Sequence, residues 1–295
     1  MGNYVDRINL LGNNADILGA DYYEGVDLTV KFASEIAQYT DPWAWMKARI
    51  TAKDFSQLHV ADYIPFTTSN NLKFNAQIAG INTYKGSGAT EIGDHIDFIS
   101  KELWPTDFQM NLVNTNNGTD DAHMPWKASN GYLFVNSLAG EVPNGTTKPY
   151  EMASVDYTAG GMYFYLPDTL KAVIANKFMY AQTRNNSTSI VSSDNSIEWV
   201  DLGKLWLPDE FEVMGAKLMT TTGWTAGGSV QYPIFAYNMN RVKRSSGSTS
   251  RLDWWLSSAS TGRTTFFVYV NSIGRVNDSS ASYALRAPFC FRISA

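Results

Sequence analysis

The chain has 295 residues, of which 44% are hydrophobic and 14% aromatic, so it can bury a full core in one large domain or two small ones. Its formal net charge at pH 7 is −5. A nucleic-acid-binding protein needs positive charge to meet the phosphate backbone, so this balance argues against that class and we expect no nucleic-acid partner.

Cysteine content and hydropathy add further expectations. The one cysteine, Cys290, lies in an apolar run at residues 288–291, so no intrachain disulfide can form and a small core residue is expected. The N-terminus has neither a basic start nor an apolar run, which argues against a signal peptide. No stretch approaches the roughly 20 apolar residues of a membrane helix, so we expect synthesis in a cytoplasm and no membrane insertion.

Residues 1–27 are polar and glycine-rich without sustained periodicity. This texture is typical of an extended arm that orders against a partner, and equally of a flexible terminus. From residue 28 to residue 53, apolar residues recur at helical spacing, beginning with Leu28 and Phe32. Asp41 and Pro42 have the pattern of an N-cap followed by proline at the first helical position, so the sequence predicts two short helices.

Beyond residue 54, strands and turns dominate the pattern. Residues 59–66 and 72–84 favour strands around a tight turn at 69–71, and residues 92–103 alternate roughly between apolar and polar. Two further segments, residues 130–139 and 166–178, are interpreted as helices. Polar loops are expected at residues 114–121 and 184–196.

The last third of the sequence has the clearest strand and turn signals. Residues 205–213 begin as a strand and continue with acidic residues that suit the first turn of a helix. Strands are predicted at 254–258, 266–270 and 287–293, with a turn at 272–275. No period of 20 to 50 residues repeats, which argues against a solenoid or a propeller.

Four motifs in this region occur together in known domains. They are Leu205-Trp206-Leu207-Pro208-x-x-Phe211-Glu212-Val213-x-Gly215, Trp254-Trp255-Leu256-x-Ser258, Phe267-Val268-Tyr269-Val270-x-x-x-Gly274-x-Val276 and Leu285-Arg286-Ala287-Pro288-Phe289. With them, residues 54–295 resemble a family of phage and prophage domains of gut Gram-positive bacteria. That family resembles the C-type-lectin-like fold of formylglycine-generating enzymes and of the variable receptor-binding proteins of diversity-generating retroelements.

The resemblance implies an α+β fold. Residues 54–295 would form a C-type-lectin-like domain of short twisted strands and a few helices, and residues 1–53 an N-terminal arm with short helices. It further implies a virion structural protein, made in the host cytoplasm and displayed on the capsid or tail surface, that binds a host surface glycan or protein. The alternative is a purely architectural head-decoration or tail protein without a host ligand.

The arm would attach the chain to other virion proteins, as a symmetric homo-oligomer. Trp43 and Trp45 are either anchors for such a contact or packed within the same chain.

The resemblance also implies a ligand site. Retroelement variable proteins carry their diversified residues on the final hairpin and the loop before it, which correspond here to residues 257–283. Nine residues of this stretch are ligand-binding candidates: Ser258, Ser260, Arg263, Thr265, Phe267, Tyr269, Asn271, Ser282 and Tyr283. Tyr, Ser and Asn are typical of adaptable binding loops, although a merely solvated hairpin has the same composition.

No enzymatic activity, cofactor or metal is expected. Formylglycine-generating enzymes bind copper through two cysteines, and this chain has only Cys290. The Glu-Pro-Asn triplet of calcium-dependent lectins is interrupted here as Glu141-Val142-Pro143-Asn144, which favours an ordinary turn. His95, beside Asp94 and Asp97, matches no ligand spacing and is interpreted as a structural histidine.

Two groups of charged residues have more than one interpretation. Asp209, Glu210 and Glu212 offer carboxylates to a glycosidase but suit the N-terminus of a helix better. The basic residues that surround a Ser/Gly-rich turn at residues 245–250 either contact a phosphate or polyanion or, more ordinarily, form a solvated loop. These basic residues are Arg241, Lys243, Arg244 and Arg251.

Overall fold

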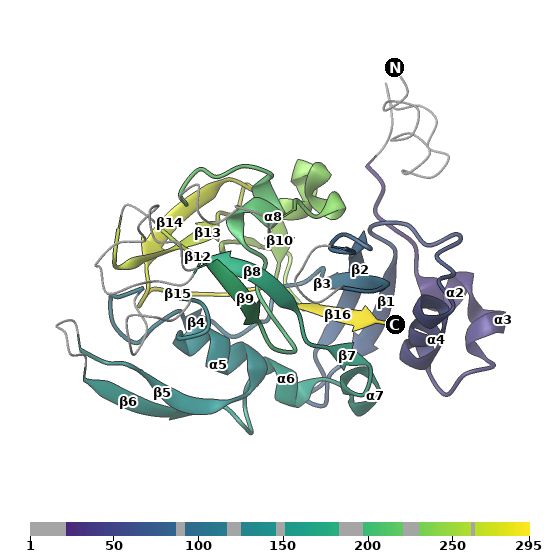
Figure 1. The fold of residues 1–295 in the computed structure, drawn as a ribbon, viewed down its shortest axis with the longest axis horizontal. Coiled ribbons are helices and arrows are strands. Elements are labelled where there is room, and N and C mark those ends of the chain that lie inside the picture. The colour runs from purple at the N-terminus through teal and green to yellow at the C-terminus, as the bar shows by residue number, and fades with distance from the viewer. Residues whose placement is uncertain are drawn as a thin grey trace, which may run out of the picture.

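In the computed structural model, a five-stranded antiparallel sheet with the order β1-β2-β3-β16-β7 forms the centre of the molecule (Figure 1). The structure describes residues 22–86, 92–116, 125–145, 151–182, 197–220, 230–260 and 263–295. The strands of the central sheet are β1 (Tyr63–Thr67), β2 (Lys73–Ile81), β3 (His95–Ser100), β16 (Cys290–Ser294) and β7 (Ile174–Ala175). A strand from the end of the sequence therefore lies between β3 and β7.

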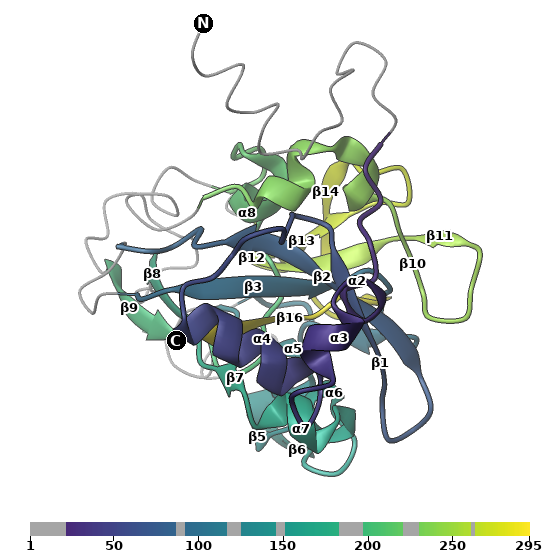
Figure 2. The ribbon, with the colours of Figure 1, turned by 90° about the vertical axis from the view of Figure 1, so that its right-hand side faces the viewer.

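In the described residues before this sheet, the chain forms the short helices α2 (Leu28–Lys31), α3 (Ala33–Ile36) and α4 (Pro42–Thr51). The Asp41 side chain accepts hydrogen bonds from the backbone N–H groups of Trp43 and Ala44, at 2.8 and 3.0 Å, so the predicted N-cap is confirmed. The first predicted helix is present but is interrupted at Phe32. Figure 2 shows α4 lying along β16 near the C-terminus.

The helices share one hydrophobic core with the sheet. Trp43 packs its ring against Phe98 of β3 and Phe291 of β16, with centroids 6.2 and 5.8 Å apart. Trp45 is fully buried and lies against Phe32. Of the two interpretations of Trp43 and Trp45, packing within the same chain is the one observed. The expected boundary at residue 53 does not separate two cores.

Strand β3 differs from the alternating pattern expected for it, since all six residues are buried. Phe98 meets α4 through Trp43, whereas Asp97 contacts Tyr232 from the opposite side. Both faces of β3 are therefore covered, and polar residues on one of them must find partners inside the protein.

The helix predicted at residues 166–178 is only partly present. Helix α7 (Asp168–Lys171) ends after one turn, and Ile174 then pairs with Ile293 in the sheet. Two β-branched residues, Val173 and Ile174, follow the short helix, and strand pairing buries Ile174 where continued helix would not. The remaining elements of the middle of the chain are β4 (Phe108–Gln109), α5 (Asn130–Asn136), β5 (Ala139–Pro143), β6 (Met152–Asp156), α6 (Met162–Tyr165), β8 (Phe178–Gln182) and β9 (Ile197–Asp201).

The last third forms a second, three-stranded antiparallel sheet of β12 (Trp254–Ala259), β13 (Phe266–Val270) and β14 (Val276–Ser280). Trp254 of β12 forms a bridge to Arg286, in the segment that leads into β16, and Trp206 forms a bridge to Cys290 of β16. Around the three-stranded sheet lie α8 (Glu210–Met214), η2 (Pro233–Ala236), η3 (Asn238–Arg241), β10 (Lys243–Arg244), β11 (Arg251–Leu252) and β15 (Ala284–Leu285).

The mixed α+β class expected from the sequence is confirmed by this architecture. The expected loop at residues 184–196 lies outside the described residues, as does the part of the 114–121 loop after residue 116. Across the ranges that the structure describes, none of the helices combines the length and the apolar character needed to cross a bilayer.

Candidate functional site

Three of the nine expected ligand-binding residues are buried and therefore do not present their side chains to a ligand at the surface. Ser258, Ser260 and Phe267 are 1%, 3% and 0% exposed. The Ser258 hydroxyl accepts a hydrogen bond from the Glu210 N–H at 2.8 Å, and the Ser260 hydroxyl donates to Asp278 at 2.8 Å. The two serines join β12 to α8 and to β14, and so serve the scaffold.

The other six candidates keep some exposure but do not share one pocket. Arg263 forms an ion pair with Asp278 at 3.4 Å and lies over the Phe266 ring. The Ala281 N–H donates to the Thr265 carbonyl, which brings Thr265 and Ser282 to the same end of the β13–β14 hairpin. The exposed Tyr283 follows directly in the chain.

Asn271 lies at the opposite end of this hairpin. Its carboxamide oxygen accepts hydrogen bonds from the N–H groups of Ile273 and Arg275, which fixes the predicted turn. Tyr269 stands between the two ends, edge-on to Trp255, and its hydroxyl accepts a hydrogen bond from Asn277. The candidates thus form a strip along β13 and its flanking turns.

Three adjoining hollows lie along the β10–β11 hairpin. The largest of them has a volume of about 630 Å³, and its neighbours about 420 and 280 Å³. The largest shares Glu102 and Gly247 with one neighbour and Arg251 with the other. The lining of the largest hollow includes Tyr22, Lys101, Glu102, Met239, Arg244 and Arg251. We call this hollow the hairpin cleft.

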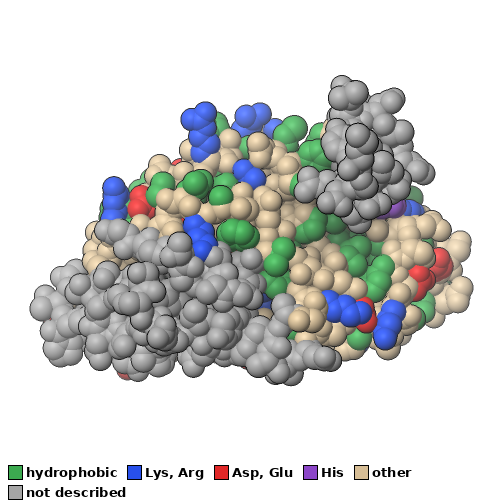
Figure 3. Space-filling model, turned by 45° about the horizontal axis from the view of Figure 1, so that its top comes forward, with side chains coloured by type: hydrophobic (Ala, Val, Ile, Leu, Met, Phe, Trp, Pro, Cys, Tyr) green, Lys and Arg blue, Asp and Glu red, His purple; other side chains and the backbone are tan. Residues whose placement is uncertain are grey.

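The four basic residues near this hairpin have different environments. Arg244 and Arg251 are exposed and line the hairpin cleft. The Lys243 ammonium is buried and donates to the carbonyls of Ser100 and Lys101, at 2.8 and 3.3 Å. Burial lowers the pKa of Lys243 to about 8. Arg241 is partly buried and donates to the Phe235 carbonyl. In Figure 3 the basic side chains are scattered among polar and apolar ones, with no continuous basic surface on the face shown.

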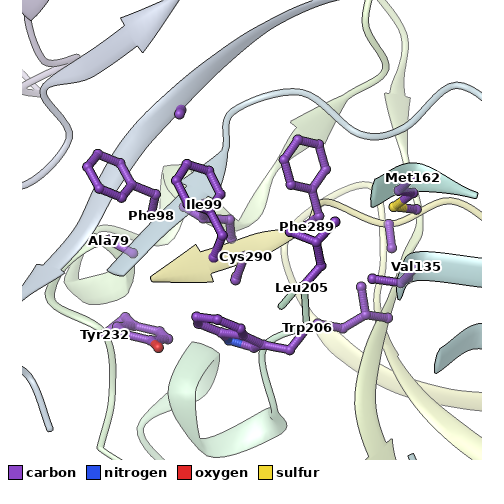
Figure 4. Packing of buried hydrophobic residues seen from close by; sticks show 14 of the residues in the cluster. Ala79, Phe98, Ile99, Val135, Met162, Leu205, Trp206, Tyr232, Phe289 and Cys290 are labelled. Carbon is purple, nitrogen blue, oxygen red and sulfur yellow. The ribbon is translucent and has the colours of Figure 1, made fainter. Parts of the chain in front are cut away.

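Beneath the central sheet lies a buried ionic network that the sequence analysis missed. Asp97 of β3 accepts two hydrogen bonds from the Arg292 guanidinium of β16, at 2.7 and 2.8 Å, and a third from the Tyr232 hydroxyl at 3.0 Å. Lys177 forms an ion pair with Glu212 and also donates to the Tyr232 hydroxyl. Figure 4 shows the rings of Trp206 and Tyr232 on the same side of β16, near Cys290.

The charges of this network are balanced internally. Burial alone would raise the pKa of Asp97, but the Arg292 guanidinium outweighs it and holds that pKa below its ordinary value. Burial, with the nearby carboxylates, raises the pKa values of Tyr84 and Tyr232 well above the usual range. The Tyr84 hydroxyl donates to Glu212 at 2.5 Å. Only the β3–β16 register brings Asp97 to Arg292, and no local sequence signal indicates that pairing.

The carboxylates at the start of α8 are also satisfied inside the protein. Asp209 and Glu212 form the two halves of a capping box, as the helix N-terminus interpretation expected. The Glu210 carboxylate accepts hydrogen bonds from the N–H groups of Leu218, Met219 and Thr220. These carboxylates therefore stabilise a helix and the segment after it.

The remaining candidate reactive groups have structural environments. His95 is buried, its Nδ1 lies 2.8 Å from the Gly93 carbonyl, and burial lowers its pKa. Burial raises the pKa of the Cys290 thiol. Glu141 is exposed on β5 while Val142 and Pro143 are buried. Among the described residues, no group of three or more His, Cys, Asp and Glu side chains is placed to hold a metal ion.

Comparison with known proteins gives one family. Residues 113–293 match the family described as "Domain of unknown function (DUF6273)". A search of curated proteins and a search of solved structures find no match. The matched region includes β7 and β16 of the central sheet and the whole of the β12–β13–β14 sheet, whereas β1, β2 and β3 precede it.

Proposed function

The chain belongs to the DUF6273 family of domains of unknown function, and we propose that it is a bacteriophage structural protein whose lectin-like domain binds a host surface glycan or protein. In this proposal the domain is displayed on the capsid or tail and catalyses no reaction. The finer C-type-lectin-like assignment is part of the proposal and rests on the four sequence motifs described above.

The positions of those motifs support the proposal. Trp206 pairs with Cys290, and the Trp255 N–H donates to the Arg286 carbonyl at 2.9 Å. The motif residues therefore pair with β16 and with the segment that leads into it. Such residues would keep a shared scaffold constant while the outward positions of β13 and its turns are free to differ.

The binding role rests on a contrast between the ionisable groups of the interior, which have partners inside the protein, and the polar and aromatic side chains at the surface. The ionic network around Asp97 and the carboxylates of α8 have internal partners, so these ionisable groups serve the scaffold. The exposed strip on β13 and its flanking turns presents Tyr, Arg, Ser and Asn side chains on rigidly packed strands. Rigid elements that display adaptable polar and aromatic side chains are typical of binding surfaces.

The proposal is tested by binding of the fluorescently labelled full chain to host cells, with a matched pair of tyrosine variants. Tyr283 is 57% exposed on the strip, and Tyr39 is 42% exposed before α4, in a different part of the molecule. We expect Tyr283→Ala to weaken binding about tenfold and Tyr39→Ala to leave it unchanged.

Immunogold labelling of intact particles tests the virion part separately. Labelled particles together with no binding of the full chain to cells would favour the architectural alternative. Unlabelled particles would contradict a virion role altogether.

A further inference from the structure

Arg244 and Arg251 stand directly opposite each other in the β10–β11 pair, in the register Arg244↔Arg251. Both side chains are exposed, and both line the hairpin cleft. Within the described ranges, neither guanidinium has an acidic side chain within ion-pair distance. Like charges at directly opposed positions destabilise a strand pair. Contacts within the described residues therefore do not explain why two arginines stand opposite each other here.

We infer that Arg244 and Arg251 bind the carboxylate or sulfate groups of an acidic oligosaccharide that lies in the hairpin cleft. An arginine fork donates two parallel hydrogen bonds to a carboxylate or sulfate, and two adjacent forks would hold successive charged groups or one group from two sides. The inference rests on the proposed function in one respect, that the ligand is a surface carbohydrate. The preference for an anion rests on the arginine pair itself.

The cleft has the other groups that a sugar ring requires. Its volume of about 630 Å³ exceeds that of a single inorganic anion. Ser248 and Thr249 bring hydroxyl groups to its wall, and Met239, 63% exposed, brings apolar surface. The Tyr22 ring is held edge-on to Tyr237, with centroids 5.9 Å apart, and its hydroxyl donates to Asn240. An aromatic ring fixed in this way can stack on the apolar face of a sugar.

A buried hydroxyl at the cleft lacks a partner. Ser245 lines the cleft and is 3% exposed, yet its Oγ has no hydrogen-bond partner among the described residues. A buried polar atom without a partner destabilises the protein, so such an atom calls for an explanation. Rotation about the Cα–Cβ bond would let this hydroxyl meet a ligand oxygen.

The acidic residues of the cleft do not cancel the arginine pair. The Glu102 carboxylate already accepts hydrogen bonds from the N–H and the side-chain amide of Asn75, at 2.8 and 2.9 Å. Glu24 remains to accept from sugar hydroxyls, and Lys101 adds positive charge on the same wall. The three basic side chains of the cleft, Lys101, Arg244 and Arg251, outnumber its two carboxylates.

Isothermal titration calorimetry on the full chain tests the inference. The probes are a heparin-derived hexasaccharide, which carries sulfates, a galacturonate hexamer, which carries only carboxylates, a neutral glucose hexamer and inorganic sulfate. We expect one or both acidic oligosaccharides to bind, more weakly at higher salt, and the neutral hexamer to bind at least about tenfold more weakly. The acidic oligosaccharide that binds identifies the charged group.

The variants are Arg244→Gln and Arg251→Gln, with Lys53→Gln as the control, which also removes one exposed positive charge. The Lys53 side chain is 71% exposed, and Lys53 lines neither the cleft nor the strip on β13. Each cleft variant should weaken acidic-oligosaccharide binding about tenfold or more, while the control leaves it unchanged. Thermal melting checks folding, and the cleft variants should melt no lower than the wild-type protein because a like-charge contact is removed.

Three results would overturn the inference: no binding of either acidic oligosaccharide, equal losses in cleft and control variants, or inorganic sulfate binding as tightly as the oligosaccharides. Each of these results can be told apart from failure of the proposed function. The host-cell assay measures binding that depends on Tyr283, and the particle labelling measures where the protein is located. If the acidic oligosaccharides do not bind while Tyr283-dependent cell binding persists, only the inference about the hairpin cleft fails.

Discussion

Arg292 is a charged residue in the middle of a hydrophobic sheet, and its partner Asp97 makes that position tolerable. The guanidinium is 2% exposed and the carboxylate 0%. Bringing two charges out of water is unfavourable, and the two hydrogen bonds between them offset it only while both partners are present. Removing one partner of the pair should therefore destabilise the protein by more than the intact pair stabilises it.

Asp97→Asn should lower the free energy of unfolding by about 3–5 kcal/mol, because Arg292 is left buried without a counter-charge. Asp107→Asn is the matched control, since Asp107 meets Arg286 at 2.8 Å with about half of the Asp107 side chain exposed. The control should change the free energy by about 1 kcal/mol or less. Urea denaturation of both variants measures the two values. Equal losses of unfolding free energy in the two variants would contradict the idea that burial makes the Asp97–Arg292 pair costly to break.

Lys243 links stability to alkaline pH. Its pKa is about 8 in the folded protein and about 10.5 when unfolded, so the folded state binds the proton less well. Stability should rise as pH increases between these two values, because protonated Lys243 disfavours folding below pH 8. We expect the difference in unfolding free energy between wild type and Lys243→Met to shift by about 2 kcal/mol from pH 7.5 to pH 9.5.

The comparison with the variant isolates Lys243 from other groups that titrate in the same range. The Cys290 thiol interacts electrostatically with Lys243, so the same comparison in a Cys290→Ala background should show the same shift. A difference that stays constant with pH would show that Lys243 is readily protonated in the folded state.

At the scale of elements, local signals account for α4 and for α8. Asp41 caps α4 through its side chain, and Asp209 with Glu212 closes a capping box at α8. These signals lie within three residues of the helix start, so a single sequence contains them. The helix expected at residues 166–178 is only partly present because β7 pairs with β16, more than 110 residues away.

Asp41→Ala should lower the free energy of unfolding by about 1 kcal/mol, because two N–H groups at the start of α4 lose their acceptor. Asp168→Ala, in the first turn of α7, is the control, since the Asp168 side chain is 98% exposed. Thermal or urea unfolding measures both. A control as destabilising as Asp41→Ala would mean that the capping interaction itself contributes little.

The candidate ligand-binding residues depend on a different kind of signal. The family resemblance indicated Tyr, Ser and Arg residues on a hairpin, and of these Tyr283 and Arg263 are exposed. Ser258 and Ser260 look the same in the sequence, yet their hydroxyls meet α8 and β14. Likewise the basic cluster was visible, but the Arg244↔Arg251 register was not. Exposure and register depend on contacts between distant segments, which residue type alone does not reveal.

At the scale of the whole molecule, the first helices cannot be removed as an independent arm. Leu28, Trp45 and Ile50 are fully buried in the core shared with the sheet. Deleting residues 1–53 would expose Phe98 and Phe291, the partners of Trp43. Residues 1–21, which carry most of the expected arm, lie outside the described residues.

Deletion of residues 1–53 should therefore abolish cooperative melting, whereas deletion of residues 1–21 keeps every described residue of the core. Light scattering on the shorter deletion tests the proposed role in assembly. An oligomer that becomes a monomer without residues 1–21 would support attachment through the arm. The same size with and without them would contradict self-association through it.

The placement of β16 has a consequence for synthesis of the protein. Asp97 leaves the ribosome 195 residues before its partner Arg292, so β3 must wait for most of translation before its neighbour exists. Until then β3 has an open, apolar edge, which is the kind of surface that chaperones cover and that aggregates when left alone. A copy cut short before residue 290 lacks the strand that joins β3 to β7, so both strands would be left unpaired on that side.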